Sequence, residues 1–390
     1  AEPGQGDPVQ VDFLETEEPG DVDARVEVSE GPMGDFSLGA GYNTSYGLVG
    51  NVRVTLYNFD ALDFPKSWED FRQGGAWLGG GQRLTLSLSP GADYQDYELS
   101  WFNPSLYDGP WFAGFSLYWH EFAWEDYYDD QRIGASVTIG REVLEDLEVS
   151  LTPQVERIDI SDVDSGAPGD AAAARGTDLK NSITLAAVYD KRDDPYLTTD
   201  GYMLSGSVEM AGVILGGDVD YFKETIEARN WWTIWEQEDW GEHVISIGGE
   251  AAMVQTGDSD SVPFYERLFM GGLGTIRGFE YLRAGPIDPV SRLQTGGTYR
   301  LLANAEYEAP LYKNILRGVL FVDAGMLERS LGDFDGDSPR VSTGIGLRVR
   351  LPRGGSAQIP INLYLAVPVV DESTDDAQLF NVSIGTGFTF

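Results

Sequence analysis

Residues 341–351 read Val341-Ser342-Thr343-Gly344-Ile345-Gly346-Leu347-Arg348-Val349-Arg350-Leu351, and apolar and polar side chains alternate along this stretch. The odd positions are apolar apart from one threonine, and the even positions carry serine, glycine and arginine. Successive side chains of a β-strand point to opposite faces of the sheet. A period of two therefore predicts a strand with one apolar face and one polar face.

The same alternation recurs from Gly34 to the end of the chain, and it predicts sixteen strands. They cover residues 35–43, 48–57, 83–89, 97–103, 111–122, 132–141, 148–159, 182–190, 202–211, 219–232, 244–254, 299–309, 316–326, 341–351, 359–367 and 380–390. Segment 219–232 has the composition of a strand, although its two faces are blurred.

Three features favour a transmembrane barrel over a soluble sandwich, which would also alternate. The polar face carries charged or small residues on nearly every strand, as a wet lumen would. Short connections alternate with long ones such as 161–180, 256–297 and 368–378. Aromatic residues gather near strand ends, as they do at membrane–water interfaces: Tyr57, Trp101, Phe102, Trp119, Phe122, Trp124, Tyr127, Tyr128, Trp231, Trp232 and Trp235. The predicted fold is all-β, a sixteen-stranded antiparallel transmembrane β-barrel.

Composition excludes several classes of protein. The 26 basic and 64 acidic residues give a net charge of −38, which excludes a nucleic-acid-binding surface. Cysteine is absent, so the chain has no disulfide framework, thiol nucleophile or cysteine-bound zinc. The only two histidines, His120 and His243, lie far apart in sequence, and no Gly-x-Ser-x-Gly elbow is present. We therefore expect neither an enzyme nor a cofactor. The acidic run 333–337 lacks the later calcium ligands, and no metal site is predicted.

Two regions interrupt the strand pattern. Residues 1–24 are rich in glycine, proline and acid, which predicts a flexible leader before a short strand at 25–30. Residues 58–81 form a long connection in which Ser67 and Asp70 have the spacing of a helix capping box. An ordered turn, an interfacial anchor and a docking helix all fit this connection, with the ordered turn favoured.

The loop 256–297 contains Ile276-Arg277-Gly278-Phe279 among many aromatic residues. A barrel loop of this length is ordered when it folds inward against the wall. The face count of the neighbouring strands turns Glu306 and Asp323 toward the lumen, where two close carboxylates need a cation. Arg277 is the candidate for that cation, although a solvated loop arginine is the simpler reading of the residue alone.

These motifs resemble those of the BamA-type outer-membrane assembly superfamily, the bacterial surface antigen barrels. Ile276-Arg277-Gly278-Phe279 resembles its Val/Ile-Arg-Gly-Phe/Tyr hallmark, and Phe321-Val322-Asp323-Ala324-Gly325 resembles its aromatic-x-Asp-x-Gly strand motif. Segment 189–202 is similar to a third motif, Asp-x-Arg-Asp-x-x-x-Pro…Gly. The resemblance covers residues 20–390. It implies an inward-folded long sixth loop whose Arg277 is shared by Glu306 and Asp323, with Phe321 and Gly325 completing the strand motif.

The C-terminus resembles the β-signal by which outer-membrane barrels are recognised for assembly. Its pattern is Ser383-x-Gly385-x-x-Phe388-x-Phe390. The first and last strands close the barrel, and the resemblance implies a lateral gate between them. The gate residues of the first strand are Phe36, Leu38, Gly39 and Gly41. Glycines that merely relieve crowding at the seam are the alternative reading of Gly39, Gly41 and Gly385.

The resemblance also implies a domain organisation and a function. Residues 1–33 are expected to be a leader and the remnant of the last POTRA domain, a periplasmic module, because Ala24–Pro32 resembles its final strand; residues 34–390 are the barrel. The implied function is folding and insertion of outer-membrane β-barrel proteins in the bacterial outer membrane. The implied partners are nascent barrel proteins, the lipid bilayer, accessory lipoproteins and periplasmic chaperones, with no nucleic acid.

One alternative function comes from the same superfamily. A two-partner-secretion-type translocator would export a soluble protein through the barrel, and it should carry a plug helix before the first strand. Residues 1–33 contain no such pattern. A passive porin is a further alternative, which steady ion conductance would reveal.

Overall fold

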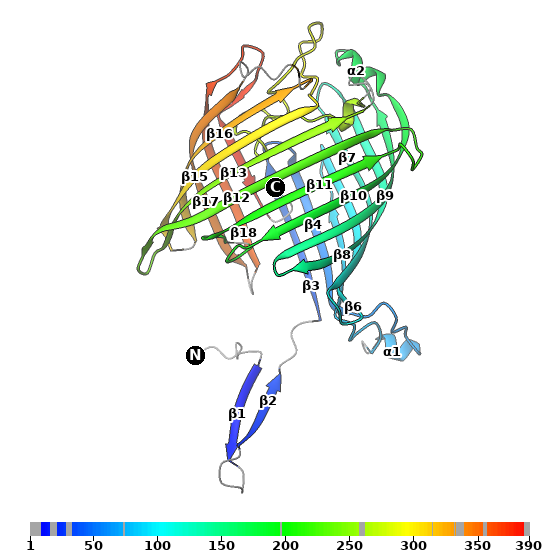
Figure 1. Ribbon diagram of the computed structural model, residues 1–390, viewed down its shortest axis with the longest axis vertical. Helices are drawn as coiled ribbons and strands as arrows, with labels where there is room; N and C mark the ends of the chain where they lie inside the picture. Colours follow the sequence, from blue (N-terminus) through cyan, green and yellow to red (C-terminus); the bar gives the residue numbers. More distant parts are fainter. Residues whose placement is uncertain are drawn as a thin grey trace.

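The computed structural model is a closed barrel in which sixteen antiparallel strands follow one another around the wall (Figure 1). It describes residues 9–15, 22–28, 33–72, 75–195, 197–256, 262–313, 315–330, 332, 339–353 and 357–385. The barrel strands are β3 (Gly34–Asn43), β4 (Gly47–Phe59), β5 (Gln82–Ser89), β6 (Tyr94–Leu106), β7 (Trp111–Trp124), β8 (Tyr128–Leu144), β9 (Leu147–Ser161), β10 (Gly176–Asp190), β11 (Gly201–Ala211), β12 (Tyr221–Gln237), β13 (Gly241–Gln255), β15 (Tyr299–Tyr312), β16 (Leu316–Glu328), β17 (Arg340–Arg353), β18 (Ala357–Val370) and β20 (Phe380–Ile384). The predicted fold class is confirmed.

Every predicted strand has its counterpart in the wall, and most strands are longer than predicted. Strand β8, for example, extends from Tyr128 to Leu144, beyond the alternating core 132–141. The chain keeps pairing with its neighbours past the apolar band, because an antiparallel ladder needs backbone groups rather than apolar side chains.

The apolar face of each strand points away from the barrel interior. The exposed apolar side chains include Leu117, Ile133, Val137, Leu151, Leu185, Leu204, Ile226, Ile247, Leu320, Ile345 and Leu365. The opposite face carries buried polar residues such as Asp130, Glu156 and Lys180. An apolar surface of this extent is stable in lipid, which removes it from water. In the described part of the chain, no helix is long and apolar enough to cross a membrane.

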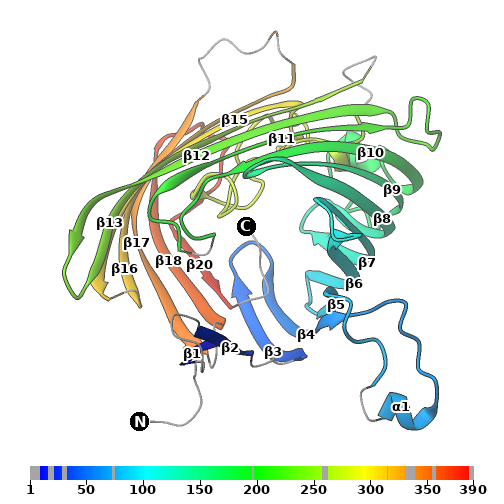
Figure 2. The same cartoon turned by 60° about the horizontal axis from the view of Figure 1, so that its bottom comes forward.

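Most connections at one end of the barrel are short, and the other end carries long ones such as 162–175 and 256–298. A two-residue turn, 145–146, joins β8 to β9, and Asp146 has φ +67° there. Residues 162–175 join β9 to β10 and contain α2 (Gly169–Ala173). The end with the short turns has one long connection, residues 60–81, which contains α1 (Trp68–Arg72), a helix of five residues that lies outside the ring of strands (Figure 2).

The N-terminal region differs from the flexible leader predicted for residues 1–24. Strand β1 (Val9–Glu15) pairs with β2 (Val22–Val28) in a separate antiparallel hairpin outside the barrel (Figure 1). Val9, Val11 and Phe13 do alternate with polar residues. The alternation is short and is flanked by glycine, proline and acidic residues, so the composition of the region predicted a flexible leader instead of a strand.

Two of the aromatic residues expected in a membrane girdle are buried instead. Tyr127 and Tyr128 pack against Phe264 of the long loop, with ring centroids 5.7 and 5.8 Å apart. Both are 2% exposed. Tyr128 is the first residue of β8 and Tyr127 is the turn residue before it, whereas Trp232 and Trp235 remain exposed on the outside.

Candidate functional site

The structure brings Arg277 together with Glu306 and Asp323. The Arg277 Nε and Nη2 atoms each donate to one oxygen of Asp323 at 2.7 Å, and Nη2 lies 2.8 Å from Glu306 Oε1. The Arg277 backbone N–H also donates to Asp323 at 3.1 Å. All three residues are less than 8% exposed. The planar guanidinium therefore holds two carboxylates from the neighbouring strands β15 and β16.

Two aromatic rings complete the surroundings of Arg277. Its Cζ atom lies 3.5 Å from the ring centroid of Phe321 and 4.8 Å from that of Tyr364. Burial alone would lower the pKa of Arg277, but the hydrogen bonds to Asp323 and the charge of Glu306 raise it above its ordinary value. The guanidinium is charged at every accessible pH.

Sequence reasoning did not identify Arg348, Tyr364 or Glu308 as members of this site. Arg348 Nη2 lies 2.7 Å from Glu306 Oε2, so Glu306 serves two arginines. Arg348 also pairs with Glu308, and its Nε donates to the Tyr364 hydroxyl at 2.8 Å. The polar face of 341–351 was the available signal, because it already turned Arg348 toward the lumen.

Gly278 follows Arg277 for a steric reason. Its φ is +91°, and a Cβ atom there would lie 3.2 Å from the Cβ atoms of both Ala366 and Ser342. Glycine alone adopts this conformation without strain. The flanking residues Ile276 and Phe279 are fully buried, and Gly325 lies against Met270.

A second set of contacts joins the motif at residues 276–279 to the loop between β18 and β20. Strand β14 (Gly278–Phe279) pairs with β19 (Ala377–Gln378), and the Glu280 N–H donates to the Asp376 carbonyl at 2.8 Å. Gln294 donates its side-chain amide to the Thr374 carbonyl at 3.1 Å. The segment 371–379 leads directly into β20, so the long loop and the last strand are physically connected.

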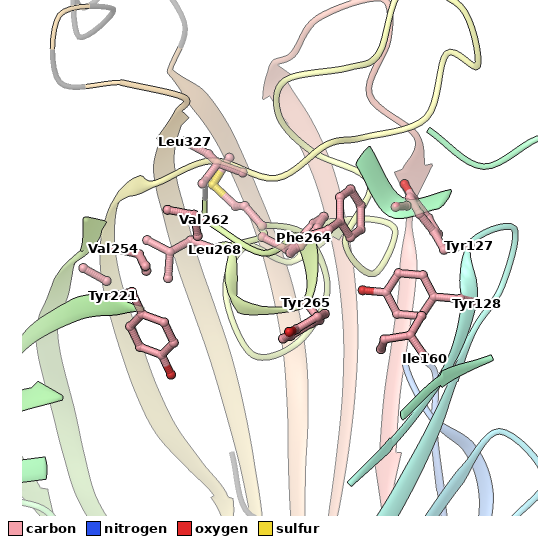
Figure 3. Close-up of a cluster of buried hydrophobic side chains, with 14 of the residues drawn as sticks. Tyr127, Tyr128, Ile160, Tyr221, Val254, Val262, Phe264, Tyr265, Leu268 and Leu327 are labelled. Carbon is pink, nitrogen blue, oxygen red and sulfur yellow. The ribbon is translucent and has the colours of Figure 1, made fainter. Parts of the chain in front are cut away.

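A separate ionic cluster anchors the start of the same loop, and sequence reasoning missed it. The helical turn η2 (Phe264–Glu266) directs Glu266 at Arg132 of β8, 3.2 Å away, and at Lys180 of β10, 3.4 Å away. The Tyr221 hydroxyl donates to Glu266 at 3.1 Å. Figure 3 shows Phe264 and Tyr265 beside Tyr127, Tyr128 and Ile160 of the wall. The loop thus rests on the polar face of the strands at two places.

The charge of Glu266 is maintained by its neighbours. Burial alone would raise its pKa, but Lys180 and Arg132 lower the pKa of Glu266 to about 2, from an ordinary value of 4.5. A carboxyl whose pKa falls on folding stabilises the fold fully above its unfolded pKa. The contribution of Glu266 is therefore complete above about pH 4.5 and is lost as the pH falls toward 2.

We expect Glu266→Gln to loosen segment 262–298. The loss should be about 2 kcal/mol, below the roughly 3–5 kcal/mol of a broken buried pair, because Asp130, Glu156 and Glu209 still neutralise the two cations. Limited proteolysis followed by mass spectrometry should detect faster cleavage within the segment. The exposed turn variant Glu145→Gln is the matched control. Identical cleavage of the two variants would contradict the anchoring role.

The residues predicted for the seam lie on β3 and β20. Phe36 and Leu38 face outward and are 65% and 63% exposed, whereas Gly39 and Gly41 take the opposite parity of β3. Ser383 pairs with Asn43, and Ile384 pairs with Tyr42. Phe388 and Phe390 lie outside the described residues, as does the acidic run 333–337. Among the described residues, no group of acids and histidines is arranged to hold a metal ion.

Gly385 follows directly after β20, whose last residue is Ile384. Its φ is +110°, and a Cβ atom there would lie 2.8 Å from the Gly41 Cα atom. Both strands therefore approach closely only because neither carries a side chain at this level.

A closed antiparallel barrel with an apolar outer face and polar inner wall is an integral outer-membrane protein. Residues 76–388 match the model of the Omp85 superfamily domain. The chain belongs to the Omp85 superfamily, which confirms the resemblance drawn from its motifs.

Relatives and solved structures agree with this assignment. The outer membrane protein assembly factor BamA of Nitratidesulfovibrio vulgaris is 25% identical over 354 residues, which are 89% of this chain and 41% of that relative. The chain thus spans less than half the length of that protein. The crystal structure of BamA from Haemophilus ducreyi lacking POTRA domains 1–3 matches 97% of this chain and 75% of that one, with a TM-score of 0.75 and 20% identity.

CdiB from Acinetobacter baumannii has the same fold at a greater distance. It matches 96% of this chain and 65% of its own, with a TM-score of 0.59 and 14% identity. The barrel fold and the BamA relatives together assign the chain to the bacterial outer membrane.

Proposed function

We propose that this chain folds and inserts outer-membrane β-barrel proteins, without enzymatic chemistry. The observation that carries the proposal is the similarity of 89% of the chain to a BamA assembly factor. The clients are nascent outer-membrane barrel proteins, and the driving force is the client's own strand pairing and burial in lipid. Accessory lipoproteins and periplasmic chaperones are the further partners in this proposal.

The proposed division of the chain follows its sequence. Residues 1–33 are a leader and the remnant of the last POTRA domain, and residues 34–390 are the transmembrane barrel. The hairpin β1–β2 is consistent with such a remnant, because it forms a sheet apart from the barrel.

The loop motif acts in this proposal as a lock. Segment 262–298 is the inward-folded sixth loop, and Ile276, Arg277, Gly278 and Phe279 fasten it to Glu306 and Asp323. The contacts of Arg277 with both acids support this role. The wall residues that contact the loop in this proposal are Phe321, Asp323 and Gly325. Phe321 stacks on Arg277, and Gly325 lies against Met270.

The proposed route into the membrane is a lateral gate between β3 and β20. The exposed backbone edge of a parted β3, including Phe36, Leu38, Gly39 and Gly41, would template an incoming strand by main-chain hydrogen bonds. Ser383, Gly385, Phe388 and Phe390 form the β-signal of this chain's own last strand. The close approach of Gly385 to Gly41 supports a seam that is held by backbone rather than by side-chain packing.

Vesicle reconstitution tests the function. We expect vesicles that contain the chain to fold a denatured outer-membrane barrel at least about tenfold faster than empty vesicles, equivalent to roughly 1.4 kcal/mol off the barrier. Folded client is measured by its heat-modifiable gel mobility. Vesicles that contain an unrelated porin are the control. Equal rates in all three preparations would refute the proposal.

The alternative function is translocation of a soluble protein through the lumen. The similarity of the fold to the CdiB barrels is the observation that favours testing this alternative. The same vesicles distinguish the two. A translocator would move a soluble cargo into the vesicle interior and leave barrel folding at the rate of empty vesicles.

A further inference from the structure

A cavity of about 530 Å³ lies beside the Arg277 site and extends past it along β17 and β18. It is lined by four arginines, Arg229, Arg277, Arg348 and Arg350, together with three acids, Glu227, Glu306 and Asp323. In a chain with only 26 basic residues against 64 acidic ones, this is a pronounced local excess of arginine. Two of the four, Arg277 and Arg348, are already paired with Glu306.

Arg350 is one cation of this cavity that no carboxylate of the described residues neutralises. Within the described residues, no carboxylate lies within ion-pair distance of Arg350, and its buried Nη1 atom has no hydrogen-bond acceptor. The charged groups that act on Arg350 are Arg348, Arg317 and Asp194. A guanidinium atom that is removed from water without an acceptor is costly, and an oxyanion would satisfy it.

The strand register places neutral donors next to Arg350. Arg348 pairs with Asn362, and Asn362 pairs with Ser383, so these three side chains form one row across β17, β18 and β20. No side-chain hydrogen bond within the described ranges occupies Asn362 or Ser383. The next row contains Arg350 opposite Pro360, and Gly385 donates its N–H to the Pro360 carbonyl at 3.0 Å.

Glu227, an acid of the cavity without an ion pair among the described residues, lies in a different row. Glu227 pairs with Glu250, Glu250 with Leu302, and Leu302 with Gly325. Gly325 pairs with Arg340, at the other end of β17 from Arg350. Glu227 is therefore far from Arg350 along β17, whereas Glu306 reaches the row of Arg348 and is already paired with Arg277 and Arg348.

We propose that this end of the cavity binds a carboxylate of a polypeptide strand, held by Arg350 with Asn362 and Ser383 as neutral donors. The proposal rests on the proposed function, because an incoming strand is the polypeptide that reaches Ser383 at the seam. A guanidinium with amide and hydroxyl donors matches the planar carboxylate, and the cavity is larger than a free ion requires. The carboxylate is either the C-terminus of the strand or an acidic side chain near its end.

Peptide binding to the full chain in detergent micelles tests the site. The probe is a fluorescent peptide with the sequence of residues 381–390 and a free C-terminus. It is compared with the amidated peptide, with an amidated peptide carrying Ser383→Asp, and with inorganic phosphate as competitor. Loss of one charge-assisted hydrogen bond should weaken binding roughly tenfold or more.

The test variants are Arg350→Gln and Arg350→Lys. The matched control is Arg141→Gln, because Arg141 lies on the outer face against Trp111. Heat-modifiable mobility verifies that each barrel is folded. We expect Arg350→Gln to abolish the preference for a carboxylate-bearing peptide over the amide, and Arg350→Lys to retain part of it. Preference for the free C-terminus supports a terminal carboxylate, and preference for the Asp peptide alone supports a side-chain carboxylate.

Two results overturn the site. One is a peptide affinity that is the same in wild type and Arg350→Gln. The other is Arg350-dependent binding of phosphate with no difference among the peptides. The vesicle assay separates failure of the carboxylate site from failure of the proposed function. If the wild-type chain folds clients but Arg350 does not affect peptide binding, only the carboxylate site is refuted.

Discussion

Arg277→Ala is expected to release segment 262–298 from the barrel wall and to expose it to protease. The substitution removes the side-chain hydrogen bonds to Asp323, the ion pair to Glu306 and the stacking on Phe321 at once. It leaves two carboxylates without the cation that lies between them. We expect a loss of at least about 2 kcal/mol, kept below the roughly 3–5 kcal/mol of a dry buried pair by water in the lumen.

Matched variants make this result specific. Arg277→Lys should restore protection in part, because an ammonium keeps the charge but cannot fork to two carboxylates. Glu306→Gln with Asp323→Asn should resemble Arg277→Ala and exceed it, because Arg348 then loses its pairing with Glu306 as well. Asp323→Asn alone should affect the loop and spare Arg348. If Arg277→Ala left both loop protection and client folding unchanged, Arg277 would be an ordinary cation with no locking role.

The strands and their faces could be predicted from the sequence because the signal is local. Each strand carries its own period of two, and the parity at Glu306 and Asp323 followed from counting residues along one strand. The contact of Arg277 with both acids followed from that parity and from the resemblance of its motif to a known one.

Contacts between distant segments had no such local signal. Glu266 lies in a loop, and its partners Arg132 and Lys180 are on strands β8 and β10, far away in sequence. Nothing in the order of residues specifies which wall a loop will touch. The pairing of β14 with β19 and the burial of Tyr127 against Phe264 were missed for the same reason. In these cases tertiary packing, rather than periodicity, determines the environment of the residue.

A disulfide across the seam is expected to stop client folding. Thr44 donates its N–H to the Val382 carbonyl at 3.1 Å, which makes the next pair, Asn43 with Ser383, a non-hydrogen-bonded pair. The Cα atoms of such a pair lie about 4.5 Å apart, within the range of a disulfide. Because the chain has no cysteine, Asn43→Cys with Ser383→Cys forms one defined cross-link. Ser136→Cys with Gln154→Cys, a registered pair of β8 and β9, is the control.

Client folding in vesicles with the seam oxidised and then reduced tests the lateral gate between β3 and β20 most directly. We predict that the oxidised seam variant folds clients at the rate of empty vesicles, that reduction restores the rate, and that the β8–β9 control is active in both states. Client folding at the full rate with the seam completely cross-linked would contradict the lateral gate and the mechanism built on it.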